Sequence, residues 1–588
     1  MRIGQAFLRR TGLALIGTGA GLVFWLFLRN LRLAESHPQG YLFAATLAAV
    51  FFATTLLCTG PLALRRVLPA ALALALALAG LLSWASLRFD SLPEFLQAPE
   101  RLVGILLLGY LPLPFLIAAG GPGWRDYPAL FGQAWSLLVR SVGAWVFVGM
   151  LWLLIFLSNT LLQLVHVHTI ARLLEIGGLP WALTGAAFGL ALAVVNEFLD
   201  FTSPYLTLRL LRLLVPVVLA VSAIFLVALP LHGLSTFFGG ISSAQTLLAM
   251  ALAGITLVSS ALAETDADAV QAPVMVRSTQ ALALLLPILA GLGATAVWLR
   301  VAQYGWTPPR IASAMVAGLA LAYGLAYALA VLRGSGWGAR IRATNTVLAL
   351  CVIGAVALAF TPALNPQSLA AEDQLARYLS GRLNLNDLDL LALRDDWGRP
   401  GREVLARLKT LAEQPGQEAL RARLAEQSQL AAIDRDTRLK LGAQLRAIVP
   451  VRPEPAGGGH SALLDALIAR TDTAELRDLL DACHRSLPDG APGCVFLAEV
   501  FLPDAIGPQG LLLYRAPSGA LRSEAVIRDP IRGLIRADTT DLAPSGSQPI
   551  DAAALIAQAQ RGPVSMAPAR MNAMEFDGHQ IVILPAGQ

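Results

Sequence analysis

Charged residues are scarce in this chain of 588 residues: they make up 14% of it, whereas apolar residues make up 56%. A typical soluble domain carries about 25% charged residues. The scarcity is confined to one part of the sequence. Residues 1–362 contain 20 Arg and 11 Asp plus Glu, and the other 24 basic and 28 acidic residues all follow. This distribution excludes an ordinary soluble fold for residues 1–362.

Motifs of common catalytic centres are absent as well. The chain contains no G-x-x-x-x-G-K-[ST] phosphate loop, no G-x-S-x-G nucleophile elbow, no H-E-x-x-H zinc motif and no dinucleotide-binding G-x-G-x-x-G fingerprint. The sequence therefore nominates no catalytic, cofactor-binding or metal-binding residue. It favours a protein without enzymatic activity and without a cofactor.

The charge balance does not indicate a nucleic-acid-binding protein. The net charge of +5 divides into +9 over residues 1–362 and −4 over the rest. The basic excess lies in short loops between apolar runs, where it sets membrane topology and forms no continuous basic surface. We therefore expect the lipid bilayer, and no nucleic acid, as the partner of this part of the chain.

Eleven uncharged apolar runs are long enough to cross a bilayer, whose hydrocarbon core takes about 20 helical residues. The last run, TNTVLALCVIGAVALAF, ends at Thr361-Pro362 because proline cannot continue a helix. The first run lacks a small-x-small cleavage site, so we expect a retained span and not a signal peptide. The predicted spans are Thr11–Leu28, Tyr41–Leu64, Val67–Leu87, Leu102–Ala119, Gly143–Val165, Gly178–Val195, Leu213–Leu231, Ala244–Ala263, Gln280–Leu299, Ile311–Leu332 and Ala343–Phe360.

The arginines of the loops predict the orientation. With a cytoplasmic N-terminus, the inside loops carry thirteen arginines and the outside loops carry seven, as the positive-inside rule requires. An odd number of spans then places the tail outside the cytoplasm, in the periplasm if the cell is a diderm bacterium. We expect a multi-pass protein of the bacterial inner membrane with a periplasmic C-terminal tail.

Four regions follow from these patterns. Residues 1–362 form the polytopic transmembrane domain. Residues 363–449 form a helical juxtamembrane segment, since leucines recur there at spacings of three and four. Residues 450–459, PVRPEPAGGG, have the composition of a linker. Residues 460–588 carry two short helical patterns and then apolar runs between turn residues, which predicts a small soluble α+β domain. The fold class is thus an all-α polytopic membrane protein followed by a helical segment and an α+β module.

Two of the four cysteines lie in the tail. Cys483 and Cys494 bracket HRSLPDGAPG, a short loop rich in Pro and Gly, and this spacing suits a disulfide in an oxidising compartment. Two inert thiols are the alternative if the tail is cytoplasmic. Cys58 and Cys351 lie inside predicted spans, where a thiol behaves as a small apolar group.

Only a few polar residues of the transmembrane domain are candidates for function. Asn159 lies within the fifth span, and Glu197 and Asp200 lie at the inner end of the sixth. A cavity, a gate or a proton-coupling carboxylate is one interpretation, because ionisable groups in membranes are costly and are kept where they are used. Helix-end groups already among the lipid head groups are the other.

All seven histidines fall on the outer side under this topology, namely His37, His166, His168, His232, His460, His484 and His579. A metal site or a response to pH is one interpretation. However, His166 and His168 are two residues apart and do not share a helix face, so we expect no metal site.

Two segments resemble a known family. The first is Tyr304-Gly305-Trp306-Thr307-Pro308-Pro309-Arg310, and the second comprises LNPQSLAAEDQLARYL and LRDDWGRPGREVLARL. Together with the many spans, they resemble the bacterial membrane proteins grouped as domain of unknown function 4153, over roughly residues 1–410. The resemblance implies a polytopic inner-membrane protein without an established activity, and it supplies no site residues.

Three functional classes remain. The leading hypothesis is a non-enzymatic membrane protein whose periplasmic tail contacts envelope proteins. A transporter or lipid flippase is the second, favoured by the number of spans. A periplasm-facing lipid or glycosyl transferase is the third, and its acidic residues would have to come from Glu35, Asp90, Glu94 and Glu100 in the first outer loops.

Overall fold

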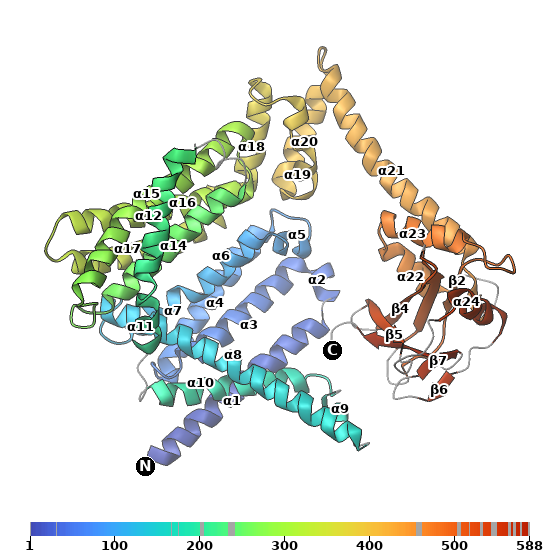
Figure 1. The fold of residues 1–588 in the computed structure, drawn as a ribbon, viewed down its shortest axis with the longest axis horizontal. Coiled ribbons are helices and arrows are strands. Elements are labelled where there is room, and N and C mark those ends of the chain that lie inside the picture. The colour runs from blue at the N-terminus through green and yellow to red at the C-terminus, as the bar shows by residue number, and fades with distance from the viewer. Residues whose placement is uncertain are drawn as a thin grey trace. The chain divides into compact units, whose positions relative to one another are not determined.

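The computed structural model divides into two compact units, Met1–Glu418 and Ala419–Gln588, which are described separately. It describes the chain except for residues 1, 31, 166, 168, 175, 200–204, 233–240, 454–460, 503–506, 517, 530–532, 542–549, 563–565, 569–571, 577–578 and 586–588. Figure 1 shows the fold, coloured from the N-terminus to the C-terminus.

The first unit consists of helices. Those that precede the exit from the membrane are α1 Arg2–Arg29, α2 Arg32–Ser36, α3 Pro38–Cys58, α4 Leu64–Ser86, α5 Leu92–Leu96, α6 Pro99–Tyr110, α7 Pro112–Ala119, α8 Tyr127–Leu164, α9 Thr169–Leu174, α10 Leu179–Leu199, α11 Tyr205–Arg212, α12 Val215–His232, α14 Ile241–Leu262, α15 Pro273–Tyr304, α16 Pro308–Leu332 and α17 Trp337–Ala359. After them come η1 Pro362–Leu364, α18 Pro366–Leu379, η2 Leu385–Asp387, α19 Leu390–Asp395 and α20 Gly398–Ala412.

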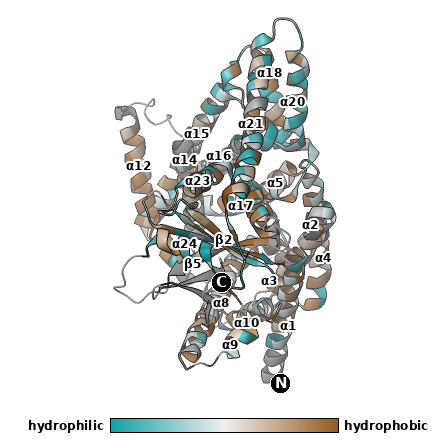
Figure 2. Cartoon of the chain, turned by 90° about the vertical axis from the view of Figure 1, so that its right-hand side faces the viewer, coloured by the Kyte–Doolittle hydropathy of each residue, from teal (hydrophilic) through white to brown (hydrophobic). Residues whose placement is uncertain are grey.

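Among the described residues, ten helices are long and apolar enough to cross a membrane, and Leu179–Val195 in α10 is a shorter apolar helix. Each of the eleven predicted spans corresponds to one of these helices. The predicted class, an all-α polytopic membrane protein with an α+β tail, is therefore confirmed. Figure 2 shows hydrophobic residues along helices such as α12 and hydrophilic residues on α18 and α20.

The helix of the fifth span begins well before the start predicted from sequence. The sequence places the fifth span at Gly143–Val165 and Arg140 in the loop before it, but the apolar helix runs over Tyr127–Leu162. Arg140 therefore lies inside α8, where its side chain is 3% exposed and donates a hydrogen bond to the carbonyl oxygen of Ser136. The helix continues through Arg140, whose Nε atom is bonded within the preceding turn.

The connections fit eleven crossings. The loop between α4 and α6 and the loop between α15 and α16 both contact the helices that follow α17. These two loops and the exit of α17 thus lie on one face of the unit. Between the first loop and the second, the chain crosses six times if α10 is counted as a crossing. An even number of crossings returns the chain to the same face. Without α10 the number would be five, and the two loops would lie on opposite faces.

Glycines allow α10 to pack closely against α1. A Cβ atom on Gly185 would overlap the carbonyl oxygen of Gly17, and one on Gly21 would overlap that of Trp181. Next along the pair, Gly189 faces Leu13, so the two helices are antiparallel. Gly17 and Gly21 form a G-x-x-x-G motif, which brings helix backbones together in lipid. This contact fixes the shorter helix α10 in the bundle.

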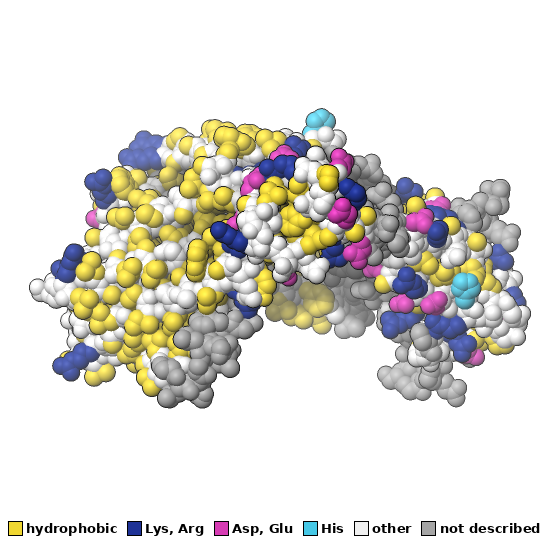
Figure 3. All heavy atoms as spheres, turned by 90° about the horizontal axis from the view of Figure 1, so that it is seen from above, with side chains coloured by type: hydrophobic (Ala, Val, Ile, Leu, Met, Phe, Trp, Pro, Cys, Tyr) yellow, Lys and Arg dark blue, Asp and Glu magenta, His cyan; other side chains and the backbone are white. Residues whose placement is uncertain are grey.

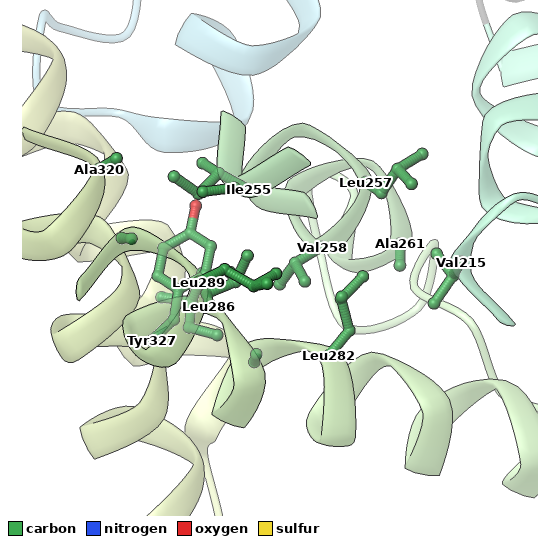
Figure 4. Packing of buried hydrophobic residues seen from close by; sticks show 14 of the residues in the cluster. Val215, Ile255, Leu257, Val258, Ala261, Leu282, Leu286, Leu289, Ala320 and Tyr327 are labelled. Atoms are coloured by element: carbon green, nitrogen blue, oxygen red, sulfur yellow. The ribbon is translucent and has the colours of Figure 1, made fainter. Parts of the chain in front are cut away.

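A polar network lies within the apolar core formed by α14, α15 and α16. Figure 4 shows the ring of Tyr327 beside Leu286 and Leu289, in a cluster of buried apolar side chains. The Tyr327 hydroxyl bonds Asn345 of α17 and lies 2.8 Å from the Ser259 hydroxyl of α14. The Asn345 amide in turn donates to the Tyr127 hydroxyl of α8 at 3.2 Å. These side chains connect four helices at one buried point.

The second unit is the soluble α+β part. Its helices are α21 Glu418–Ile448, α22 Ala462–Arg470, α23 Thr473–His484 and α24 Ala552–Arg561. Its strands are β1 Val451–Arg452, β2 Cys494–Leu497, β3 Gln509–Arg515, β4 Leu521–Asp529, β5 Gly533–Asp541, β6 Met566–Pro568, β7 Asn572–Phe576 and β8 His579–Pro585. They form one sheet in the order β1-β2-β3-β4-β5-β8-β7-β6, antiparallel except for β1 beside β2.

Both faces of strands β2 and β3 are buried. Val495, Leu511 and Leu513 pack with residues of α24, whereas Phe496 and Leu512 pack with α22 and α23. Alternate residues of one strand point to opposite faces, so the run CVFL supplies apolar side chains to two cores. This explains why polar and apolar residues do not alternate along CVFL.

The compact units do not coincide with the predicted regions. The juxtamembrane segment 363–449 is divided near residue 418: its first helices belong to the membrane unit and α21 belongs to the second unit. Val451 and Arg452, assigned to the linker by composition, pair with Phe496 and Leu497 as strand β1. The rest of the linker, from residue 454, lies outside the described residues.

Candidate functional site

Three helices after the last span, α18, α19 and α20, cover one face of the membrane unit, and we call them the collar. Proline cannot continue α17, and Asn365 then caps α18 by accepting a hydrogen bond from the backbone of Ser368. An ion pair joins Arg407 of α20 to Glu372 of α18. Figure 3 shows basic and acidic side chains gathered where the collar lies, beside a largely hydrophobic surface. The collar is thus the charged cover of an apolar bundle.

The collar contacts the loop between α4 and α6. The Arg399 backbone donates to the Arg88 carbonyl oxygen at 2.7 Å, and its side chain lies 3.0 Å from Asp90. Arg402 forms ion pairs of 2.8 Å with Asp90 and 3.2 Å with Glu94. Because residues more than 300 positions apart meet here, the collar holds this loop in place.

The collar also contacts the loop between α15 and α16. The Asp373 carboxylate accepts a hydrogen bond of 2.7 Å from the backbone of Trp306, and the Gln374 amide donates to the Tyr304 carbonyl oxygen at 2.9 Å. Gly305 between them has φ 79°, a conformation that other residues adopt at a cost. The two segments that carry the family resemblance therefore meet in space.

An apolar cavity of about 470 Å³ lies beneath this covered face. Its volume falls in the range of small-molecule sites, about 300–1,000 Å³. One wall comes from α4, α5 and α6, and the other from α14, α16 and α17, with Pro366 and Gln367 of α18 at one end. The apolar lining includes Leu107, Leu252, Met315, Leu319, Val352 and Val356. The cavity thus separates the early helices from the late ones.

Two arginines line the cavity. Arg88 donates to the carbonyl oxygens of Ala359 and Thr361, at 3.1 and 2.7 Å, and so closes the end of α17. The Arg101 guanidinium lies over the rings of Phe89 and Phe95, 4.3 and 5.8 Å from their centres. Its Nε and Nη1 atoms are buried and have no hydrogen-bond partner within the described part of the chain. Such buried donors are rare, because each costs the free energy of its lost hydration.

The charges around the mouth of the cavity affect one another. Burial, with the charge of Arg101 as a smaller cause, lowers the pKa of Arg88 to about 10, so Arg88 stays protonated at neutral pH. Burial, together with the carboxylates of Asp395 and Asp389, raises the pKa of Asp396. Acidic groups thus stand beside the arginines.

The structure describes the side chain of only one of the three polar residues singled out from sequence. Asn159 lies in α8, half-buried, and its carbonyl oxygen has no partner among the described residues. Glu197 belongs to α10, but its side chain, like Asp200 as a whole, lies outside the described residues. Asn159 does not line the cavity.

Cys483, at the end of α23, and Cys494, at the start of β2, are both buried and are joined by a disulfide bond in the structure. Their oxidation in the cell stays a prediction. Among the described residues, no group of three or more His, Cys, Asp or Glu side chains is placed to hold a metal ion. His37 and His484 are exposed, and His166, His168 and His460 lie outside the described residues.

Sequence reasoning missed the cavity arginines. Arg88 and Arg101 are two of the seven arginines counted in the outside loops, and the hydrogen-bond partners of Arg88, Ala359 and Thr361, are far away in sequence. Asp90, Glu94 and Glu100 were named only as candidate acids of a transferase, yet Asp90 and Glu94 pair with the collar. A usable signal is the sequence LRFD-SLPEF-LQAPER, in which several charges and aromatic rings interrupt two apolar runs.

Comparisons of this chain with family models, with curated proteins and with solved structures found no match. The resemblance to domain of unknown function 4153 therefore stays a prediction. The site must be interpreted from its own geometry.

Proposed function

We propose that this protein is a non-enzymatic, multi-pass protein of the bacterial inner membrane that holds its C-terminal unit in the periplasm. The observation that carries the proposal is the collar. It joins the exit of α17 to the loops before α6 and before α16, and eleven crossings from a cytoplasmic N-terminus put that exit outside. The arginine distribution of the loops agrees with this direction.

The cysteine pair supports the same side. Cys483 and Cys494 are the two cysteines of the C-terminal unit and lie within bonding distance. Disulfides persist in the periplasm and are rare in the cytoplasm. A periplasmic unit anchored by eleven helices suits a role in contacts with envelope proteins, and the family resemblance agrees with an inner-membrane protein.

The geometry gives less support to a transferase. Asp90 and Glu94, two of its four candidate acids, form ion pairs with Arg399 and Arg402. Carboxylates engaged in these ion pairs are less available to contact a substrate. A lipid carrier or flippase is the second candidate, because the cavity lies between two groups of membrane helices.

Labelling of cysteines in intact spheroplasts tests the orientation. A variant with Cys58 and Cys351 replaced by serine leaves Cys483 and Cys494 as its thiols. We expect a membrane-impermeant maleimide to label them only after reduction and denaturation of the exposed unit, without lysis of the spheroplasts. Labelling that needs lysis but no reductant would place the unit in the cytoplasm and overturn the proposal.

Two matched single-cysteine controls calibrate the accessibility in the cysteine-free protein. Ser335→Cys lies between α16 and α17, on the predicted cytoplasmic face, and Gln414→Cys lies just after the collar. We expect only Gln414→Cys to be labelled in intact spheroplasts. The reverse pattern would invert the whole topology.

A further inference from the structure

The cavity extends far into the membrane unit. Along α16 its lining runs from Pro308, at the start of the helix, to Tyr323. This stretch is about 22 Å long at roughly 1.5 Å per residue. A hydrocarbon core is about 30 Å thick, so the cavity begins at the membrane surface beneath the collar and passes the depth of one leaflet. An extended acyl chain has this shape and polarity.

The rim of the cavity carries exposed apolar side chains. Val103 of α6 is 55% exposed and Leu252 of α14 is 45% exposed, and both line the cavity. In a bilayer, side chains of this kind face lipid tails. The cavity is therefore accessible sideways from the hydrocarbon core, which is the route of a lipid tail and not of a water-soluble substrate.

The mouth of the cavity offers hydrogen-bond donors for an anion. Arg101 has two buried nitrogen atoms without a partner, and Arg88 beside it adds a second positive charge. A guanidinium binds phosphate with charge-assisted hydrogen bonds, which are roughly twice as strong as neutral ones. Glu100 also lines the cavity and offers a carboxylate to a positively charged group close to that phosphate.

We propose that this cavity binds one phospholipid, with an acyl chain along α16 and the phosphate on Arg101. The carboxylate of Glu100 favours a head group that carries an amine over one with an additional negative charge. The bound lipid fills the space between the early and late helices, and its phosphate lies beside the guanidinium groups of Arg101 and Arg88, which both line the cavity. The site depends on the collar face alone, so it stands whichever side of the membrane that face occupies.

The test is native mass spectrometry of the full-length protein, released from nanodiscs of phosphatidylethanolamine and phosphatidylglycerol in equal amounts. Two variants change different parts of the site. Arg101→Gln removes the charge, and Ala312→Phe places a ring in the cavity, which Ala312 lines. Arg333→Gln is the matched control, an exposed arginine at the opposite end of α16.

We expect the wild type and Arg333→Gln to retain one phospholipid, mainly phosphatidylethanolamine. Arg101→Gln should reduce this retention by roughly tenfold, the loss of one charge-assisted hydrogen bond. Ala312→Phe should abolish it through steric exclusion. Gel filtration and the thermal midpoint identify any variant that fails to fold, and the other variant then decides.

Three outcomes would overturn the proposal. Folded Arg101→Gln and Ala312→Phe variants that retain lipid like the wild type would mean that lipid binds elsewhere. Retention of free fatty acid in place of phospholipid would assign the cavity to a carboxylate ligand. Equal loss in Arg333→Gln would mean that the lipid is held by general charge. A periplasmic or cytoplasmic labelling result leaves all three outcomes unaffected, so the two proposals fail independently.

Discussion

Different kinds of chemical group hold the helices and strands together in the membrane unit and in the C-terminal unit. In Ala419–Gln588, large apolar side chains pack on both faces of strands β2 and β3. A disulfide between Cys483 and Cys494 joins α23 to β2. In Met1–Glu418, glycines allow close contact between α1 and α10, and hydroxyl and amide groups join four helices.

The difference follows from the solvent. In water, burial of apolar surface drives association. In lipid the tails are as apolar as leucine, so close backbone packing and interhelical hydrogen bonds provide the specificity. The same unit leaves an apolar cavity beneath its collar, which a lipid can fill at no hydrophobic cost. The following changes test this contrast, beginning with the largest expected effect.

Gly185→Ala should destabilise the membrane unit most. Its Cβ atom would overlap the Gly17 carbonyl oxygen, and backbone cannot move aside as a flexible side chain does. We expect a loss of about 3 kcal/mol or more, at the upper end for overpacking. The thermal midpoint in detergent measures it, with Gly318→Ala as the control, since nothing lies within 4 Å of that Cβ position. Equal midpoints would refute the close contact.

Replacing Cys483 and Cys494 by serine should weaken the C-terminal unit alone. A bond across 11 positions stabilises a fold by about 3 kcal/mol in the chain-entropy description. Hydrogen exchange of the β2 and β3 peptides in the full-length protein should become faster, and reductant should have the same effect on the wild type. Slower or unchanged exchange in the variant would show that the bond is not formed.

Asn345→Leu should weaken the membrane unit moderately. It leaves the buried hydroxyl groups of Tyr327 and Tyr127 with fewer partners, at a cost of about 1–3 kcal/mol. Thr295→Val is the control, because the exposed Thr295 donates its hydrogen bond to the Gly291 carbonyl oxygen of its own helix. The thermal midpoint of Asn345→Leu should be lower than that of Thr295→Val. If Thr295→Val falls as far as Asn345→Leu, the network has no special role.

Glu524 should give the C-terminal unit a small dependence on pH. Burial raises the pKa of its carboxyl group, and Glu475 adds to this, although Arg536 lies 3.0 Å away and opposes it. A raised pKa means that the folded unit binds the proton more tightly than the unfolded chain. Its contribution to stability is therefore complete below the pKa of the unfolded chain and is lost as the pH rises through the folded value.

Hydrogen exchange of β4 peptides, corrected for intrinsic rates, measures this dependence. Acidification from neutral pH through the titration of Glu524 should slow exchange in the wild type relative to Glu524→Gln, which cannot titrate. Parallel pH profiles of the two proteins would refute the raised pKa.

Much of the fold was predictable from local sequence. Every predicted span has its helix, and β2 and β3 lie in apolar runs of the tail, because hydrophobic length and pattern act within a few residues. The fifth span was predicted too short at its start. Arg140 was taken as its boundary, but tertiary burial and backbone carbonyls accommodate the guanidinium inside α8.

The candidate site was not predictable in the same way. Arg101 is one of several outer-loop arginines in the sequence, and only packing distinguishes it by burying two of its nitrogens against Phe89 and Phe95. Asn345 differs from Asn159 only in its surroundings. Asn345 bonds partners 18 and 218 residues away, and the burial of Arg101 depends on how the rings of Phe89 and Phe95 pack, which no local pattern records.

The sequence by itself determined that this is a membrane protein with a soluble α+β tail, because the free energy of burying about 20 apolar residues in lipid depends on composition alone. Only the tertiary structure decided which distant segments of the chain contact one another. The collar on Asp90 and Trp306, the glycine contact of α1 with α10, and the cavity at Arg101 arise from contacts between distant segments, whose free energies exist only once the helices are packed.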